Sequence, residues 1–193
     1  MKALPKHCLP AALAALAGCA TPPPSKEEIL VLRSVRESRT DKSDWCTRER
    51  TGFAAAAEGG FTIEDRFSLW AVQSRGGDGR VVDAAAGRAG ELRTCLASTA
   101  DRRVLAFHGE GTVAGEEVSG HGDCRVLQAD QPAKGLFVLA CQLVLKPASA
   151  VYTGGQLTSN TLNSPATFGM ASDPPGYTQV SIATVRLWRR EPR

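Results

Sequence analysis

The chain has 193 residues, of which 42% are hydrophobic and only 6% aromatic, and its formal net charge is +3. A chain of this length can bury one core of its own, and so small a charge does not favour nucleic-acid binding. The few aromatic residues disfavour a transmembrane β-barrel, whose lipid interfaces need aromatic girdles.

The first residues have the pattern of a secretory signal peptide. Lys2 and Lys6 precede an apolar, alanine-rich run at residues 9–17. This run is too short to span a bilayer as a helix, but it matches the apolar region of a signal peptide. We therefore predict a leader at residues 1–18, and its removal lowers the charge by two because it contains two lysines and no acid.

The leader ends in Leu16-Ala17-Gly18-Cys19. These residues resemble the lipobox of bacterial lipoproteins. The resemblance implies cleavage before Cys19, a diacylglyceryl thioether on its sulfur, and an acyl chain such as palmitate on its new amino group. Asp after the lipidated cysteine tends to retain these lipoproteins at the inner membrane, whereas this chain has Ala20. The expected location is the outer membrane, with the protein facing the periplasm.

Residues 19–25 contain the proline-rich sequence TPPPS and predict a stiff, extended tether. A single folded domain is then expected over residues 26–193. Its start is ambiguous, because Ser25 and Glu28 could form a capping box ahead of a helix, while residues 25–40 also alternate as a strand. We favour the strand, and we expect a short helical turn near residues 53–58.

Strand signals dominate the rest of the chain. In residues 61–72, Phe61, Ile63, Phe67 and Leu69 alternate with polar residues, and Asp65 falls on their apolar face. Residues 135–146 are apolar on both faces, which is typical of a central strand. The other expected strands are residues 79–84, 90–98, 103–113, 117–128, 149–160 and 177–190, the last following a turn at 173–176.

About eight strands at hairpin spacing predict an all-β fold, either an antiparallel barrel or a sandwich. We favour the barrel, because closure removes exposed edge strands. We match the domain to no family, although such a barrel is similar in shape to calycin and allene-oxide-cyclase barrels, and shape does not fix function.

Besides Cys19, four cysteines remain for the folded domain: Cys46, Cys95, Cys124 and Cys141. An even number in an exported chain predicts two disulfides. A turn near Pro132 would bring Cys124 opposite Cys141, which leaves Cys46 to pair with Cys95. The alternative is four buried free thiols.

Residues 107–124 form a predicted hairpin with chemistry on one face. Folding at Gly115–Glu116 would place His108 opposite Asp123 and Glu110 opposite His121. Two imidazoles and two carboxylates could bind zinc or another divalent cation. The alternative is a solvated outer face, with the glycines of the other face allowing a tight barrel bend.

Residues 152–170 are rich in uncharged polar groups and predict either a ligand-binding loop or ordinary turn structure. The candidate ligand-binding residues are Tyr152, Gln156, Ser159, Asn160 and Asn163. A separate candidate is a buried ion pair between Asp65 and Arg186, acting as a structural clamp.

Catalytic motifs such as G-x-S-x-G and H-E-x-x-H are absent from the sequence, which favours a non-enzymatic role without a cofactor. We expect a periplasmic binding or envelope-structural module, anchored to the membrane by lipid and recognising a small ligand or an envelope protein. The alternative is a metal-dependent protein or enzyme that uses the histidine hairpin. A lumen with a cavity would favour ligand binding, and a solid one would leave only the surface.

Overall fold

Strands make up most of the residues that this computed structural model describes, namely 26–47, 51–52, 60–74, 81–82, 87–99, 101, 103–130, 134–163 and 179–191. The predicted leader, the whole tether with Cys19, the helical turn at 53–58 and the turn at 173–176 lie outside these residues. No helix among the described residues is long and apolar enough to cross a membrane.

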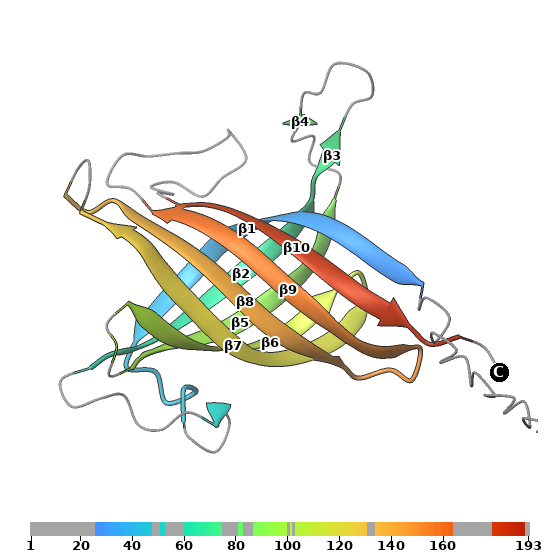
Figure 1. The fold of residues 1–193 in the computed structure, drawn as a ribbon, viewed down its shortest axis with the longest axis horizontal. Coiled ribbons are helices and arrows are strands. Elements are labelled where there is room, and N and C mark those ends of the chain that lie inside the picture. Colours follow the sequence, from blue (N-terminus) through green and yellow to red (C-terminus); the bar gives the residue numbers. More distant parts are fainter. Residues whose placement is uncertain are drawn as a thin grey trace, which may run out of the picture.

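Within the described residues, eight strands close into one antiparallel barrel, in the order β1-β10-β9-β8-β7-β6-β5-β2 (Figure 1). Each strand pairs with its neighbour along the chain, and β1 pairs with β10 to complete the circle. The strands are β1 (Glu27–Asp41), β2 (Thr62–Ala71), β5 (Arg88–Ser98), β6 (Val104–Val113), β7 (Glu116–Ala129), β8 (Phe137–Pro147), β9 (Tyr152–Asn163) and β10 (Gln179–Arg189). The predicted all-β barrel is therefore confirmed.

Two predicted strands need separate comment: the first one, which the sequence left ambiguous, and the one expected at residues 79–84. The segment before residue 42, which the sequence left between helix and strand, is the long barrel strand β1. Of the strand expected at 79–84, the structure describes only β4 (Val81–Val82), which pairs with β3 (Gln73–Ser74) in a small ribbon outside the barrel. Only two residues pair in each strand of this ribbon, so it adds little to the fold.

Two inward glycines allow β6 and β7 to coil tightly. A Cβ on Gly111 would collide with the backbone carbonyl of Glu91, and one on Gly122 would collide with that of Gln142. Glycine at a barrel bend permits this close approach of neighbouring backbones. The glycine-rich face of the hairpin is therefore the inner face, as the second interpretation of residues 107–124 predicted.

Leucine and valine side chains fill one end of the barrel. This end contains the start of β1 and the end of β10, because Glu27 is opposite Trp188 (Figure 1). We call this the closed end. The fully or almost fully buried side chains that fill it are Leu32, Val113, Val118, Leu143, Leu145, Val185 and Leu187.

Two disulfides fix the barrel wall, with the predicted pairing. Cys124 on β7 and Cys141 on β8 are register partners and are bonded to each other. Cys46, in the connection from β1 to β2, is bonded to Cys95 on β5. The interpretation of these cysteines as free thiols is therefore wrong.

The apolar run in β8 has a different environment from the one predicted. Its inward residues Leu143 and Leu145 are buried, but Val144 on the outer face is 69% exposed. In a barrel every strand has two neighbours, yet only the inner face is covered. The run therefore belongs to a one-sided barrel strand and not to one buried on both faces.

Candidate functional site

The barrel contains a cavity of about 610 Å³ at the end opposite its leucine filling. Its floor includes Leu69, Leu92 and Leu157, which also belong to the core. At its other limit it is lined by Arg39, Phe61 and Phe137, which are solvent-exposed and lie near the ends of β1, β2 and β8. The cavity is therefore a cup with a mouth at the end away from the start of β1 and the end of β10.

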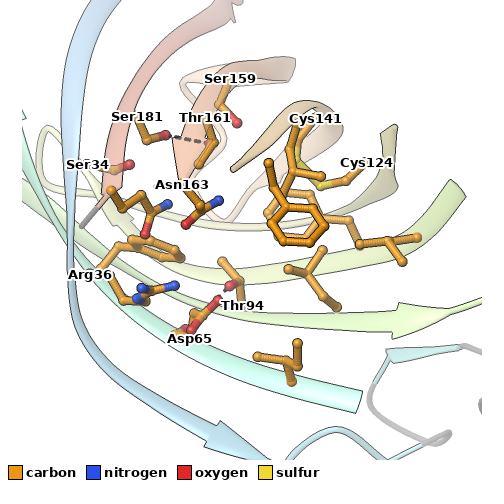
Figure 2. A pocket seen from close by; sticks show the side chains of 18 of the residues that line it. Ser34, Arg36, Asp65, Thr94, Cys124, Cys141, Ser159, Thr161, Asn163 and Ser181 are labelled. Atoms are coloured by element: carbon orange, nitrogen blue, oxygen red, sulfur yellow. Dashed lines mark hydrogen bonds between the residues drawn. A yellow bond between two sulfur atoms is a disulfide. The ribbon is translucent and has the colours of Figure 1, made fainter. Parts of the chain in front are cut away.

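The wall of the cup has an apolar side. Strands β5 to β8 supply it with hydrocarbon and with the Cys124–Cys141 disulfide, and Thr94 of β5, beside Asp65, is its polar exception (Figure 2). Apart from the disulfide, the side chains of this apolar wall are Leu92, Leu96, Leu105, Phe107, Val126, Ala129, Phe137 and Leu139.

The other side of the cup is polar. Strands β1, β2, β9 and β10 direct hydroxyl, amide and charged groups into the lumen among a few apolar neighbours (Figure 2). The members of this polar wall are Ser34, Arg36, Arg39, Asp65, Ser159, Thr161, Asn163, Gln179 and Ser181. The lumen is therefore amphipathic along its length, with one side suited to hydrocarbon and the other to polar groups.

Asp65 is the buried carboxylate of the polar wall. Its side chain is 4% exposed, and its Oδ1 atom has no hydrogen-bond partner. Burial raises the pKa of Asp65, while the positive charges of Arg36 and Arg39 act in the opposite direction. Arg36 and Asp65 project into the same part of the lumen (Figure 2).

Asp65 does not pair with Arg186, so the predicted clamp is wrong. Arg186 is exposed on the outside of β10, 3.8 Å from Glu27. Alternation along β10 explains this, because Val185 and Leu187 on either side of Arg186 are buried in the lumen.

The polar stretch that begins at Tyr152 is strand β9 up to Asn163, and not a loop. Ser159 and Asn163 line the lumen, while Gln156 and Asn160 belong to the opposite, outward face. Thr161, between Ser159 and Asn163 in the strand, also lines the lumen and shares a 2.9 Å hydrogen bond with Ser181 of β10.

Tyr152 lies apart from these residues at the closed end. It packs against the core there, and its hydroxyl donates to the Glu28 carboxylate at 2.9 Å. Of the five predicted ligand-binding residues, the structure places Ser159 and Asn163 in the cup. Tyr152, Gln156 and Asn160 do not face it.

The histidine hairpin lies on the outside of the barrel, in a different register from the predicted one. Its turn is Ala114–Gly115, both at positive φ, so His108 faces His121 and Glu110 faces Ser119. Asp123 is opposite Ala106 and not opposite His108. The predicted register is wrong because it centred the turn one residue too late.

His108 forms a chain of contacts with its neighbours. Its Nδ1 is 3.2 Å from Nδ1 of His121, and its Nε2 is 3.0 Å from the carboxylate of Glu110. Among the described residues, no group of three or more histidine, cysteine, aspartate or glutamate side chains is placed to hold a metal ion. The hairpin brings two histidines and one acid into contact, but the metal interpretation gains no support.

The connection from β1 to β2 covers this part of the outer wall. Trp45 lies 5.7 Å from the His108 ring, and the Arg93 guanidinium lies 4.4 Å over the Trp45 ring. Arg93 also donates to Glu64 at 2.6 Å, and this bond is the main reason that the pKa of Glu64 is lowered to about 2. These contacts, with the Cys46–Cys95 disulfide, bury His108 to 2% exposure.

Sequence reasoning missed Arg36, Arg39 and Gln179 as residues of the lumen. A bulge between Arg36 and Ser38 shifts the alternation of β1, so that both arginines face inward. Gln179 could have been predicted from the sequence. It lies two residues before Ser181 and four before Ala183, so the alternation of β10 places all three side chains on the inner face. Comparison of the chain with known protein families, curated proteins and solved structures finds no match.

Proposed function

We propose that this protein is a lipid-anchored binding protein of the bacterial outer membrane, whose barrel lumen takes up a small, largely apolar molecule. The observation that carries the proposal is the 610 Å³ cup, which is closed at one end and open at the other. Ligand pockets in proteins usually have volumes of roughly 300–1,000 Å³ and mainly apolar linings. An eight-stranded barrel is wide enough to hold one small ligand.

Packing energetics support a role for the cup. A lumen built only for stability would be filled along its whole length, as it is at the closed end, because each cavity in a core lowers stability. Here the filling stops at Leu69, Leu92 and Leu157, and the remaining length is left to the cavity.

The proposed cellular location rests on the sequence of the leader. Leu16-Ala17-Gly18-Cys19 resembles a lipobox, and Ala20 matches lipoproteins sorted to the outer membrane. Charged side chains on the barrel exterior, such as Arg66, Arg125 and Arg186, support a wall that faces water. We therefore propose that lipid on Cys19 holds the barrel at the membrane while the barrel itself lies in the periplasm.

A dye-binding experiment tests the lumen directly. The protein, purified from an oxidising compartment, is titrated with N-phenyl-1-naphthylamine, an uncharged dye that fluoresces in apolar pockets. Leu139→Trp would fill the apolar wall of the cup and should weaken dye binding by about tenfold or more, as expected when an ordered binding volume is lost.

Val144→Trp is the matched control, because Val144 lies on the outer face of the same strand. This variant should bind the dye like the parent. Equal binding by both tryptophan variants, or no saturable binding by the parent, would contradict a binding role for the lumen.

A further inference from the structure

Two buried acceptors in the lumen have no hydrogen-bond partner in the protein. They are Asp65 Oδ1 and Gln179 Oε1, and no other buried side-chain nitrogen or oxygen in the described part of the chain shares this state. Both side chains are 4% exposed, and both line the cup. An unpaired buried polar atom costs about 1–3 kcal/mol, and a charged one more. Two such atoms in one cavity point to a ligand that supplies the missing partners.

The type of atom defines the partner. A carboxylate oxygen and an amide oxygen both accept hydrogen bonds, so the ligand must donate. The other hydroxyl groups that line the cup belong to Ser34, Thr94, Ser159, Thr161 and Ser181. Thr161 and Ser181 bond to each other, and Thr94 donates to the backbone carbonyl of Asp65 at 3.3 Å. The unpaired acceptors are therefore the groups of this wall that need an external donor.

The charges in the cup disfavour one class of donor. Of the charged groups that act electrostatically on Asp65, Arg36 and Arg39 line the same cavity, whereas the carboxylates of Asp41 and Glu64 do not. An ammonium group at Asp65 would therefore meet two positive charges and one negative charge within the cup. Repulsion from two guanidinium groups opposes a cation there. An uncharged hydroxyl donates equally well and meets no such repulsion.

We infer that the ligand is an uncharged hydrocarbon with at least two hydroxyl groups, one of which donates to Asp65 and another to Gln179, while its hydrocarbon packs against the apolar wall on β5 to β8. This inference deepens the proposed function and depends on it. It assigns Asp65 and Gln179 as the residues that select the ligand's polar group, while the apolar wall provides affinity without selecting a particular hydrocarbon.

Competition with probes that share a ten-carbon chain tests the assignment. Bound N-phenyl-1-naphthylamine is displaced at pH 8 with 1-decanol, with decyl methyl ether, which cannot donate, or with decylammonium. The parent should release the dye to decanol at a concentration about tenfold lower than to the ether, since one hydrogen bond to a buried acceptor changes affinity by about that factor. Decylammonium should compete less well than decanol.

Two substitutions, alone and combined, locate the effect. Asp65→Leu and Gln179→Leu combined should bring the decanol and ether concentrations close together, because the double variant removes both acceptors, and each single variant shows whether the one hydroxyl of decanol uses that acceptor. Gln142→Leu is the matched control, since Gln142 is exposed on the outer face of β8, and it should keep the parent's preference. Asp65→Leu should remain folded, because it replaces an unpaired buried carboxylate with an apolar group, and its circular dichroism and melting temperature check this.

The outcomes separate this inference from the proposed function. Equal displacement by decanol and ether, or stronger displacement by decylammonium, would overturn the hydroxyl assignment while leaving the lumen as a binding cavity. Failure of the parent to bind the dye, or dye binding that Leu139→Trp leaves intact, would overturn the proposed function itself.

Discussion

Glu64 is the carboxylate that holds the outer wall of the barrel together. Although it points away from the lumen, it is 5% exposed and accepts bonds from Arg93, Ser43 and Arg66. Asp65, its neighbour in the chain, faces the opposite side and lacks a partner for Oδ1. The two adjacent acids therefore differ in pKa direction, since hydrogen bonds lower the pKa of Glu64 and burial raises that of Asp65.

Replacing Glu64 by glutamine should reduce stability by about 2 kcal/mol at neutral pH, because Arg93 would lose its charged partner. The folded pKa of about 2 lies below the ordinary value of 4.5. The stabilisation by Glu64 is therefore complete above pH 4.5 and disappears as the pH falls towards 2.

Urea unfolding at a series of pH values measures this difference. The gap in unfolding free energy between the parent and Glu64→Gln should close between pH 4.5 and 2. Glu117→Gln, at an exposed acid on β7, provides the control and should change stability little at any pH. A gap of constant size down to pH 2 would show that the charge of Glu64 is not what stabilises the wall.

Among the structural elements, the β6–β7 turn is not built from the best residues for its shape. Ala114 has φ = 52° and Gly115 has φ = 82°, a pair that two-residue hairpins usually fill with Asn-Gly. Alanine has a steric cost in this conformation, whereas asparagine tolerates it.

We expect Ala114→Asn to raise the free energy of unfolding by roughly 0.5–1 kcal/mol. Gly115→Ala in the same turn should lower it by a similar amount, because it adds a Cβ at positive φ. Urea denaturation of both variants measures the effect. A loss of stability in Ala114→Asn would contradict the register described for this hairpin.

The Cys46–Cys95 disulfide fastens the β1–β2 connection over the outer wall. It closes a longer segment than Cys124–Cys141 does, with a sequence separation of 49 against 17. In the chain-entropy model, these lengths correspond to about 4 and about 3 kcal/mol of stability.

Replacing Cys46 and Cys95 by alanine should therefore cost more than replacing Cys124 and Cys141. It should also expose the His108 ring, which the connection now covers. Guanidinium denaturation gives the first comparison, and the rate of histidine modification by diethyl pyrocarbonate gives the second. A larger loss from the Cys124–Cys141 pair would show that loop length does not govern the bracing.

At the scale of the whole molecule, the two ends of the barrel differ, since one is closed and the other carries the mouth of the cup. The chain enters β1 at the closed end, so a lipid on Cys19 would attach there, within a chain length of about 28 Å. The mouth of the cup would then point away from the bilayer, because it lies at the opposite end of the strands.

Fluorophores attached to the lipidated protein in vesicles test this orientation. Ala150→Cys places a label at the closed end, in the β8–β9 turn, and Lys134→Cys places one near the mouth, in the β7–β8 connection. Spin-labelled lipid headgroups should quench the label at residue 150 more strongly. Equal or stronger quenching at residue 134 would place the mouth at the membrane.

Much of the architecture can be predicted from the sequence, because a barrel strand repeats with a period of two. The alternation around Ile63 and Phe67 identifies the inner face of β2 and places Asp65 on it. The disulfide pairing also follows, since the turn after β7 brings Cys124 opposite Cys141. These features depend on local pattern alone.

The site could be predicted only in part, because it depends on register and on bulges. A one-residue error in the turn at Ala114–Gly115 changed the predicted partners of His108. The bulge after Arg36 directs Arg39 into the lumen, and the alternation of apolar and polar residues in the sequence does not reveal this bulge. Whether a lumen is filled or hollow depends on the summed volume of inward side chains from all eight strands, which no single segment reveals.

The seam between β1 and β10 also sets an order of events during folding. β1 (Glu27–Asp41) has no second neighbour until residues 179–189 are available, since β10 is its partner. Both disulfides join cysteines that precede β9, so covalent bracing can come before the barrel closes. Closure is then the slowest contact to form, because it joins the most distant segments of the chain. A chain that ends before β10 would leave the edges of β1 and β9 open, and an open edge is where a second copy can add its strand.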